Sequence, residues 1–164
     1  MTNTDAHDFY LGDLIERGGV YHRVAGDNPP EILAYMAMSL PELSGTDRAV
    51  LLKATLEREV LMSTGIGRGI AAPHPRNPVL AEGSQPFVAL GFPAAPVDWN
   101  TPDGSRVSSV FWIVSVSAKQ HLSTLSKINF LCQQEKILSL IKAQASKDEI
   151  VAALLEAEKT WTAK

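Results

Sequence analysis

The sequence predicts one α/β domain, built as a single mixed β-sheet with helices on both faces. Its 164 residues are 45% hydrophobic and 20% charged, which is enough apolar material for one core of ordinary domain size. Segments with helical spacing of apolar residues alternate with short apolar runs. The longest run, near Val110–Val116, is typical of a central strand covered on both faces. We assign the whole chain, 1–164, to one domain, with 1–8 as a flexible start.

The first quarter of the chain predicts two short apolar pieces followed by a helix. Leu11–Ile15 and Val20–Val24 are separated by two glycines and are expected to be strand or loop. Asp27-Asn28-Pro29-Pro30 is typical of a helix start, because an Asp or Asn cap precedes proline in the first turn. Apolar residues at helical spacing follow it.

A second helix is expected over Thr46–Leu61. Ser44 to Asp47 resembles a capping box with Asp in place of Glu. An apolar stripe at intervals of four residues runs along this helix and consists of Leu52, Leu56 and Val60.

The middle of the chain predicts a loop and three strands. The alternating glycines of 62–69 end helical structure and favour a loop. Strands are expected at Ile70–Ala72, Phe87–Phe92 and Val107–Val116, with a turn at Asp103-Gly104 before the last.

Three helices are expected to close the chain. The first begins near His121, the second spans Glu135–Lys142, and the third starts at Ser146, whose spacing to Glu149 forms a capping box.

Composition excludes several classes of protein. The net charge of −3 argues against nucleic-acid binding, which usually requires a basic face. The polar, acidic start lacks the features of a signal peptide, and no apolar run reaches the roughly 20 residues that span a bilayer, so a cytoplasmic protein without membrane insertion is expected. The single cysteine, Cys132, fits a core position, and no His, Asp or Glu grouping has metal-ligand spacing. We therefore expect neither a metal nor a cofactor.

The segment from Arg58 to Arg76 carries the chemistry. Its glycines and the hydroxyls of Ser63 and Thr64 are suited to an anion site, and His74 follows a proline at a predicted strand end. A neutral imidazole is a good nucleophile near pH 7, so His74 is suited to accept phosphate. The glycine spacing fits neither a dinucleotide site nor a P-loop. From the residues alone, a tight loop beside an ordinary surface histidine remains an equal alternative.

The same segment resembles the signature of a known family. Arg58-Glu59, Ser63–Gly67, Gly69, Ile70-Ala71 and Pro73-His74 are similar to the enzyme IIA domain of the bacterial phosphotransferase system, fructose/mannitol class, which includes nitrogen-regulatory enzyme IIA. His121-Leu122 with Leu125 is similar to the family's second histidine element, and the resemblance extends from about Leu11 to Ala157.

The resemblance implies a role for each of these residues. His74 would be phosphorylated by the phosphohistidine of an HPr-type carrier and would pass the group to an enzyme IIB or keep it as a signal. His121 would hydrogen-bond the phosphoryl group, and Arg58 would offer the fork that suits phosphate oxygens. The phosphate cradle would be completed by Ser63, Thr64, Gly65 and Gly67.

The resemblance leaves two functions open: a phosphotransferase with a transient phosphohistidine, or a regulatory module whose phosphorylation state controls a transporter, kinase or nitrogen-related partner. A third, a protein of this family that has lost phosphorylation and only binds partners, is disfavoured because Arg58, His74 and His121 are all retained. The sequence contains no fused IIB, IIC or HPr segment, which keeps the second open. A partner surface ringed by Ile66, Ile70 and Val79 is expected, with Ile70 equally suited to the core.

Other residues receive structural interpretations. The chain departs from the family pattern at Ala72, Pro75 and Arg76, and Arg76 is expected to be solvated. Glu59 is expected to be a solvated carboxylate at a helix end, although it is a candidate for tuning Arg58 or His74. Packing or structural roles are expected for His22, Trp99, Trp112 and Trp161, and His7 lies in the frayed start.

Overall fold

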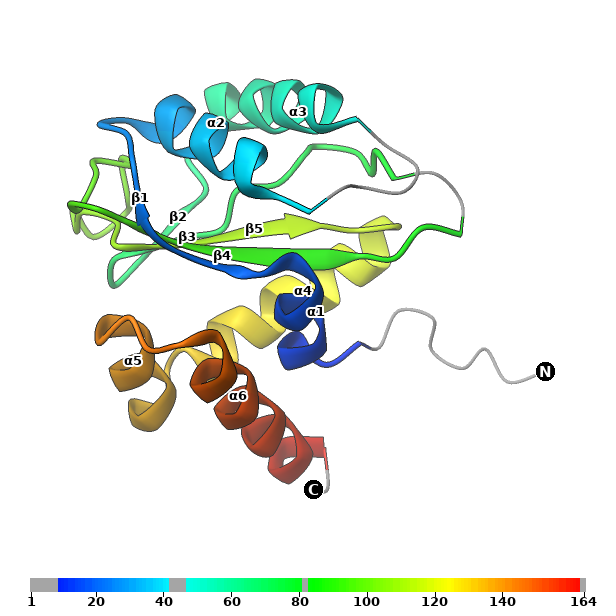
Figure 1. Cartoon of the computed structure of the whole chain (residues 1–164), viewed down its shortest axis with the longest axis vertical. Helices are drawn as coiled ribbons and strands as arrows, with labels where there is room; N and C mark the ends of the chain where they lie inside the picture. Colours follow the sequence, from blue (N-terminus) through cyan, green and yellow to red (C-terminus); the bar gives the residue numbers. More distant parts are fainter. Residues whose placement is uncertain (1–8, 42–46, 81–82, 163–164) are drawn as a thin grey trace.

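A five-stranded sheet lies between two layers of helices in the computed structural model, which describes residues 9–41, 47–80 and 83–162 (Figure 1). One face of the sheet is covered by α2 (Pro29–Ser39) and α3 (Arg48–Leu61). The other is covered by α1 (Leu11–Gly18), α4 (Ala118–Leu131), α5 (Glu135–Lys142) and α6 (Lys147–Thr162). The predicted mixed sheet with helices on both faces is therefore confirmed.

The sheet is mixed in direction, with the order β1-β4-β5-β3-β2. Parallel pairs are β1 with β4 and β3 with β5, whereas β4 with β5 and β2 with β3 are antiparallel. The strands are β1 (Val20–Val24), β2 (Gly65–Gly67), β3 (Ile70–Ala71), β4 (Phe87–Pro93) and β5 (Ser109–Val114).

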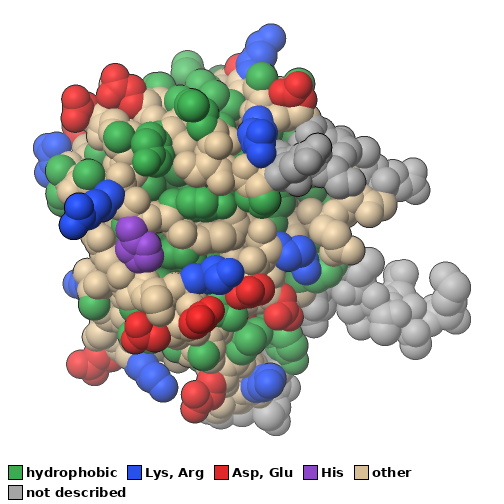
Figure 2. All heavy atoms as spheres, in the orientation of Figure 1, with side chains coloured by type: hydrophobic (Ala, Val, Ile, Leu, Met, Phe, Trp, Pro, Cys, Tyr) green, Lys and Arg blue, Asp and Glu red, His purple; other side chains and the backbone are tan. Residues whose placement is uncertain are grey.

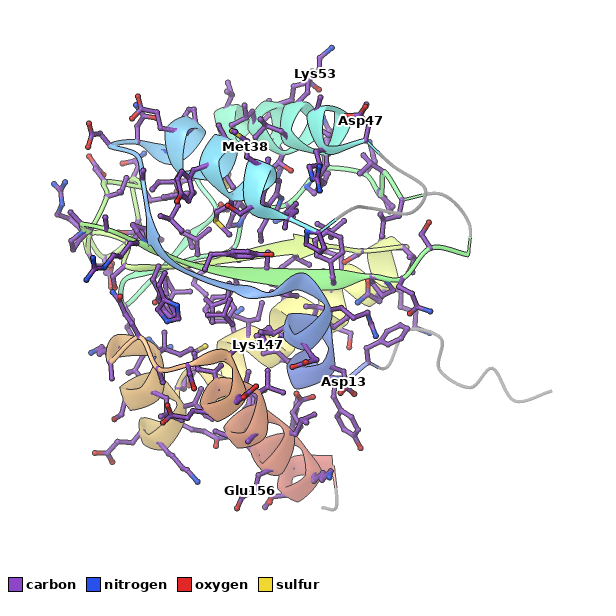
Figure 3. The ribbon with its side chains drawn as sticks, viewed as in Figure 1. Asp13, Met38, Asp47, Lys53, Lys147 and Glu156 are labelled. Carbon is purple, nitrogen blue, oxygen red and sulfur yellow. The ribbon has the colours of Figure 1, made fainter. Side chains whose placement is uncertain are left out.

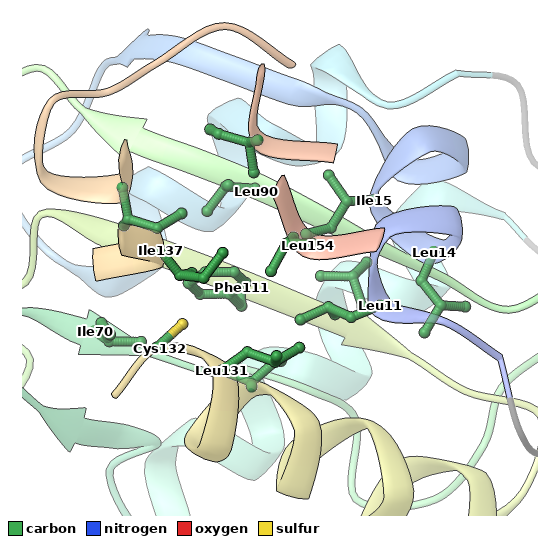
Figure 4. Packing of buried hydrophobic residues seen from close by; sticks show 14 of the residues in the cluster. Leu11, Leu14, Ile15, Ile70, Leu90, Phe111, Leu131, Cys132, Ile137 and Leu154 are labelled. Atoms are coloured by element: carbon green, nitrogen blue, oxygen red, sulfur yellow. The ribbon is translucent and has the colours of Figure 1, made fainter. Parts of the chain in front are cut away.

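The central strand, β5, divides the core into two halves. Phe111 and Ile113 point to the four-helix side, whereas Val110, Trp112 and Val114 point to the α2–α3 side. This alternation is the period of two that a pleated strand imposes. Figure 4 shows Phe111 and Leu90 of the sheet facing Leu11 of α1 and apolar residues of α4, α5 and α6. The expected buried strand is confirmed, and every residue of β5 is buried.

The strand predicted over Val107–Val116 is shorter at both ends. Val107 exchanges two backbone hydrogen bonds with Val97, at 2.9 and 2.7 Å, and so belongs to a separate bridge. After Val114 the chain turns toward Ser117, which caps α4.

The segment Leu11–Ile15 is a helix, and the prediction of strand or loop was wrong there. Leu11, Leu14 and Ile15 have the helical spacing i, i+3, i+4, and all three are fully buried. The two glycines after them end the helix. Gly19 has a φ of 94° and donates to the Ile15 carbonyl at 2.7 Å, a left-handed position that suits glycine.

The α2–α3 layer confirms the predicted start of α2 and corrects part of the predicted apolar stripe of α3. Asn28 caps α2 by accepting from the Glu31 amide at 2.9 Å, and Asp47 caps α3 by accepting from the Ala49 amide at 2.6 Å. Ser44 and Thr46 lie outside the described residues. The fully buried positions of α3 are Leu51 and Thr55, and Leu52 and Leu56 of the predicted stripe are half-buried and pack against the same core, so only Val60 departs from it. Val60 is 85% exposed.

The closing helices largely follow the sequence pattern. α5 has the predicted bounds, and Ser146 accepts from the Glu149 amide at 3.3 Å at the start of α6, as a capping box requires. α4 begins at Ala118, three residues before the expected start. Cys132 is a buried core residue, and burial raises the pKa of its thiol to about 12.

A buried ion pair joins three helices below the sheet. Lys127 Nζ of α4 lies 3.7 Å from Glu158 Oε2 of α6 and donates to the Phe9 carbonyl at 2.5 Å. The other Glu158 oxygen accepts from the Gly12 amide in the first turn of α1, at 3.1 Å. A carboxylate at a helix N-terminus is favourable there, so Glu158 fixes α1 against α6.

The surface carries both signs of charge (Figure 2). Asp47 and Lys53 lie on the outer side of the α2–α3 layer, and Lys147 and Glu156 lie on the opposite layer (Figure 3). In the part of the chain that the structure describes, no helix combines the length and apolar character needed to cross a membrane.

Candidate functional site

The site forms where two parallel strands, β3 and β5, end side by side. Ile70 pairs with Ser109 and Ala71 with Val110, and the Ile113 amide extends this pairing by donating to the Pro73 carbonyl at 2.9 Å. The segments that follow β3 and β5 leave the sheet at this edge. The first continues into His74 and the second into the start of α4, so the topology brings the side chains of these two segments together.

The two predicted histidines are neighbours at this edge. The ring centroids of His74 and His121 lie 4.1 Å apart, with 40° between the ring planes. His121 is the fourth residue of α4, whose N-cap Ser117 accepts from the Gln120 amide at 3.1 Å. The second histidine therefore stands in the first turn of a helix, near the positive end of the helix dipole.

His74 is held in one orientation by the main chain. Its Nδ1 lies 2.8 Å from the Ala72 carbonyl, and a carbonyl oxygen only accepts, so Nδ1 carries the proton. In the neutral ring this leaves the lone pair on Nε2. Burial lowers the pKa of His74 below its ordinary value, and the positive charge of Arg58 lowers it further, whereas the Ala72 bond and Glu59 act in the opposite direction.

His121 is neutral at pH 7 for similar reasons. Burial is the main cause that lowers its pKa to about 4, followed by the positive charges of His74, when protonated, and Arg58. Both rings therefore enter a reaction uncharged, and His74 offers a free Nε2.

Arg58 supplies the fixed positive charge of the site. It stands in the last turn of α3, and its Nη1 donates to the Met62 carbonyl at 2.7 Å. Its charge lowers the pKa of both histidines. The structure thus brings Arg58, His74 and His121 together from α3, the β3 edge and α4.

Glu59 is a bonded carboxylate, and the expectation that it is solvated was wrong. It is half-buried and accepts from the Thr64 amide at 2.9 Å and from the Thr64 hydroxyl at 2.5 Å. The Thr64 carbonyl accepts from the Ala72 amide at 2.9 Å, and Ala72 in turn holds His74. Glu59 therefore supports the orientation of His74 through two residues. The sequence signal for this bonded role is the position of Glu59 at the end of a helix, five residues before Thr64.

The glycine segment is partly a strand, which corrects the prediction of a loop over 62–69. Gly65–Gly67 forms the edge strand β2. The Gly65 amide donates to Ser63 Oγ at 3.0 Å, and Ser63 Oγ donates to the Trp99 carbonyl. Gly67 has a φ of 93° and lies against Asp103, whose carboxylate accepts from the Arg68 amide at 2.9 Å.

A cavity of about 190 Å³ adjoins both histidines. Its lining includes Val79 and two of the residues that depart from the family pattern, Pro75 and Arg76. None of the four predicted cradle residues, Ser63, Thr64, Gly65 and Gly67, is part of that lining. Their contact with phosphate therefore stays a prediction.

The expected apolar ring is composed differently. Ile70 is a core residue with 2% of its surface exposed, and Ile66 packs against the same core. Val79 lines the cavity, as expected of the ring, and Leu122, beside His121, lines it too and is exposed. Leu61 and Met62, which follow Arg58 at the end of α3, are also exposed.

Residues given structural interpretations mostly have such roles. His22 Nε2 lies 3.0 Å from the Gln144 carbonyl, which ties β1 to the α5–α6 connection. Trp99 and Trp112 are buried, and Trp161 stacks on Phe130 with 4.5 Å between ring centroids. Within the described ranges, no three His, Cys, Asp or Glu side chains are placed to hold a metal ion. His7 lies outside those ranges.

Sequence comparison places these features in a family. Residues 14–157 match the family model described as "Phosphoenolpyruvate-dependent sugar phosphotransferase system, EIIA 2". The fructose-specific EIIABC component of Bacillus subtilis is 33% identical over 69% of this chain, a match that spans 18% of that protein. The nitrogen regulatory protein of Bradyrhizobium diazoefficiens is 26% identical over 88% of this chain and 94% of its own length.

Structural comparison agrees. The nitrogen regulatory protein IIA-Ntr of Neisseria meningitidis superposes with a TM-score of 0.73 at 27% identity, over 88% of this chain and 98% of that one. The mannitol enzyme IIA from Escherichia coli, solved with phosphorylated enzyme IIB, shares the fold at a TM-score of 0.66 and 14% identity, over 84% of this chain and 94% of that one. The chain belongs to the enzyme IIA family of the phosphoenolpyruvate-dependent sugar phosphotransferase system.

Proposed function

We propose that this protein is a cytoplasmic phosphoryl carrier that accepts a phosphoryl group on Nε2 of His74 from an HPr-type phosphohistidine protein. It then transfers the group to an enzyme IIB or keeps it as a signal. The observation that carries the proposal is the pair of half-buried histidines, 4.1 Å apart, with Nδ1 of His74 bound to the Ala72 carbonyl.

The proposed step is a direct transfer between two ring nitrogens. The Nε2 lone pair of His74 attacks the phosphorus, the P–N bond of the donor breaks, and the donor imidazole leaves. The His74 ring gains positive charge as the new bond forms. The Nδ1–H bond to the Ala72 carbonyl stabilises that charge, so the same contact that frees Nε2 also supports the product.

Two neighbours stabilise the phosphoryl oxygens in this proposal. Arg58 contributes a permanent positive charge, and His121 contributes a ring N–H near the N-terminus of α4. Such transfers depend on positioning and charge more than on covalent help from the protein. The predicted contacts of Ser63, Thr64, Gly65 and Gly67 with the phosphoryl group belong to the proposal as well.

The proposed docking surface for the donor is the apolar side chains around His74. Leu61, Met62 and Leu122 are between 62% and 70% exposed. Their apolar surface would exclude water during transfer, and the contact is expected to be small, at or below roughly 1,200 Å², so that the partners separate again. Acidic residues of this chain would steer a basic partner, so binding would weaken with salt.

A regulatory role is the second candidate. It is favoured by the match to the Bradyrhizobium nitrogen regulatory protein, which spans nearly that protein's whole length. In this case the phosphorylation state of His74 would control a transporter, kinase or nitrogen-related partner. Neighbouring genes separate the two roles, since sugar permease genes favour transport and an alternative sigma factor gene favours regulation.

Phosphorylation itself is tested by incubating the protein with enzyme I, phosphoenolpyruvate and the HPr-type carrier. The parent should gain an acid-labile, base-stable phosphoryl group, and His74→Ala should gain none. His22→Ala is the matched control, because His22 lies on β1 outside the cavity lining and should leave labelling unchanged. Undiminished labelling of His74→Ala would remove the basis of the proposal.

A further inference from the structure

One buried hydroxyl lines the cavity beside the two histidines and has no hydrogen-bond partner among the described residues. Ser115 follows β5 directly and is 7% exposed. Within the described parts of the chain, its Oγ has no hydrogen-bond partner. Buried polar groups in native proteins are almost always paired, so an unpaired one requires an explanation such as a missing ligand or water.

The surrounding polar groups do not supply that partner, because they bind one another. The Val116 amide donates to Gln120 Oε1 at 3.3 Å, and the Gln120 side-chain amide donates to Thr124 Oγ1 at 2.9 Å. Ser117 Oγ accepts the Gln120 backbone amide as the cap of α4. The start of α4 is therefore complete without Ser115.

Ser115 lines the same cavity as His74 and His121. The cavity of about 190 Å³ is far larger than the ~10–15 Å³ of cavity space that one water needs, so there is room for a larger group. Ser117 and Ala118, at the N-terminus of α4, also line it, and the first turn of that helix carries no acidic residue. A buried donor and a helix N-terminus around one cavity favour a tetrahedral oxyanion.

The alternation along β5 explains why this position faces the site. Phe111 and Ile113 point to the face that α4 covers, and Ser115 continues that series one residue past the end of the strand. The Ile113 amide binds the Pro73 carbonyl, which fixes the end of β5 beside the residue that precedes His74.

We propose that the Ser115 hydroxyl donates a hydrogen bond to an oxygen of the phosphoryl group on His74, and this inference rests on the proposed function. Ser115 keeps its proton throughout. The P–N bond of the donor breaks and the P–Nε2 bond of His74 forms, while the hydroxyl binds one of the transferred oxygens. Ser115 is thus a further contact to the phosphoryl group, beside Arg58, His121 and the predicted cradle.

The test compares Ser115→Ala and Ser115→Cys with the parent in two measurements: the melting temperature of the unphosphorylated protein and the equilibrium of phosphoryl exchange with the HPr-type carrier. Neither variant should lower the melting temperature of the unphosphorylated protein, because no described residue binds the hydroxyl there. The equilibrium of phosphoryl exchange with the HPr-type carrier should shift toward the carrier by about tenfold, the low end for a hydrogen bond to a charged acceptor. Cysteine is slightly larger than serine, so it leaves no void, and it is only a weak donor, so it reports the same loss if alanine perturbs folding.

Ser109→Ala is the matched control. Ser109 is 2% exposed at the far end of the same strand and does not line the cavity. It should leave the exchange equilibrium at the parent value. If Ser115→Ala and Ser115→Cys exchange like the parent while the parent is labelled on His74, the Ser115 contact is refuted and the proposed function stands. If the parent takes no label, both fail.

Discussion

Replacing Thr64 by valine tests whether its hydroxyl is a structural link between Glu59 and the core. The side chain is 6% exposed, and its hydroxyl donates to Glu59 Oε1 at 2.5 Å and accepts from Trp99 Nε1 at 3.3 Å. Valine has the same shape and neither contact. The variant therefore leaves a carboxylate oxygen and a buried indole N–H without their partner.

Thr55 provides the matched comparison. It is fully buried in α3 and accepts from Trp112 Nε1 at 3.0 Å, while its own hydroxyl donates to the Leu51 carbonyl at 2.8 Å. An unpaired buried donor costs about 1–3 kcal/mol, and this cost applies to both valine variants. Thr64→Val additionally loses a bond to a charged acceptor, which contributes about 1 kcal/mol after allowance for the half-exposed position of Glu59.

The expected loss of unfolding free energy is therefore about 2–4 kcal/mol for Thr64→Val and about 1 kcal/mol less for Thr55→Val. Urea denaturation measures both, and the larger loss lowers the melting temperature by roughly 5–15 °C in a domain of this size. Glu59→Gln with Thr64→Val in a double-mutant cycle should show coupling. The reasoning is wrong if Thr64→Val costs less than Thr55→Val, or if Glu59 and Thr64 show no coupling.

Three further predictions concern the reaction. His121→Ala should still be labelled, but it should transfer the phosphoryl group onward about tenfold more slowly or lose it to water about tenfold faster, because a hydrogen bond to a charged acceptor is lost. Parent rates in both steps would exclude this role of His121. In an NMR titration the midpoint for protonation of the His74 ring should lie below pH 6.5, since burial lowers its pKa. Acceptance of phosphate should therefore fall to half of its level at high pH only below pH 6.5, and a midpoint above 6.5 would contradict this. Leu61→Asp should weaken binding of the HPr-type carrier, seen as smaller amide shifts around 65–76 and His121, whereas shifts confined to Ile150–Leu155 would place the partner elsewhere.

The fold could be predicted wherever local signals agreed with the packing. The caps at Asn28 and Ser146 mark real helix starts, and the apolar run of β5 is a central strand because it is covered on both faces. Leu11–Ile15 was missed because five residues contain little more than one helical turn. Its apolar side chains become fully buried only when α1 packs against α6 and the sheet, which the sequence pattern does not show.

The sequence pointed to Arg58, His74 and His121, which the structure brings together, while their roles stay predictions. The pattern around His74 and His121 identified the family, and pairing of the two rings follows from the parallel register of β3 and β5, which the sequence does not state. Glu59 was assigned to solvent because a carboxylate at a helix end is usually exposed. Ser115 lacks any motif, since an unpaired hydroxyl is a property of the assembled fold.

The most direct test of the central claim is NMR of the phosphorylated protein labelled with ¹⁵N in its histidine rings. The account predicts that phosphorus couples to Nε2 of His74 while Nδ1 stays protonated, as its bond to the Ala72 carbonyl requires. Coupling of phosphorus to Nδ1 of His74, or to a ring nitrogen of His121, would contradict the account.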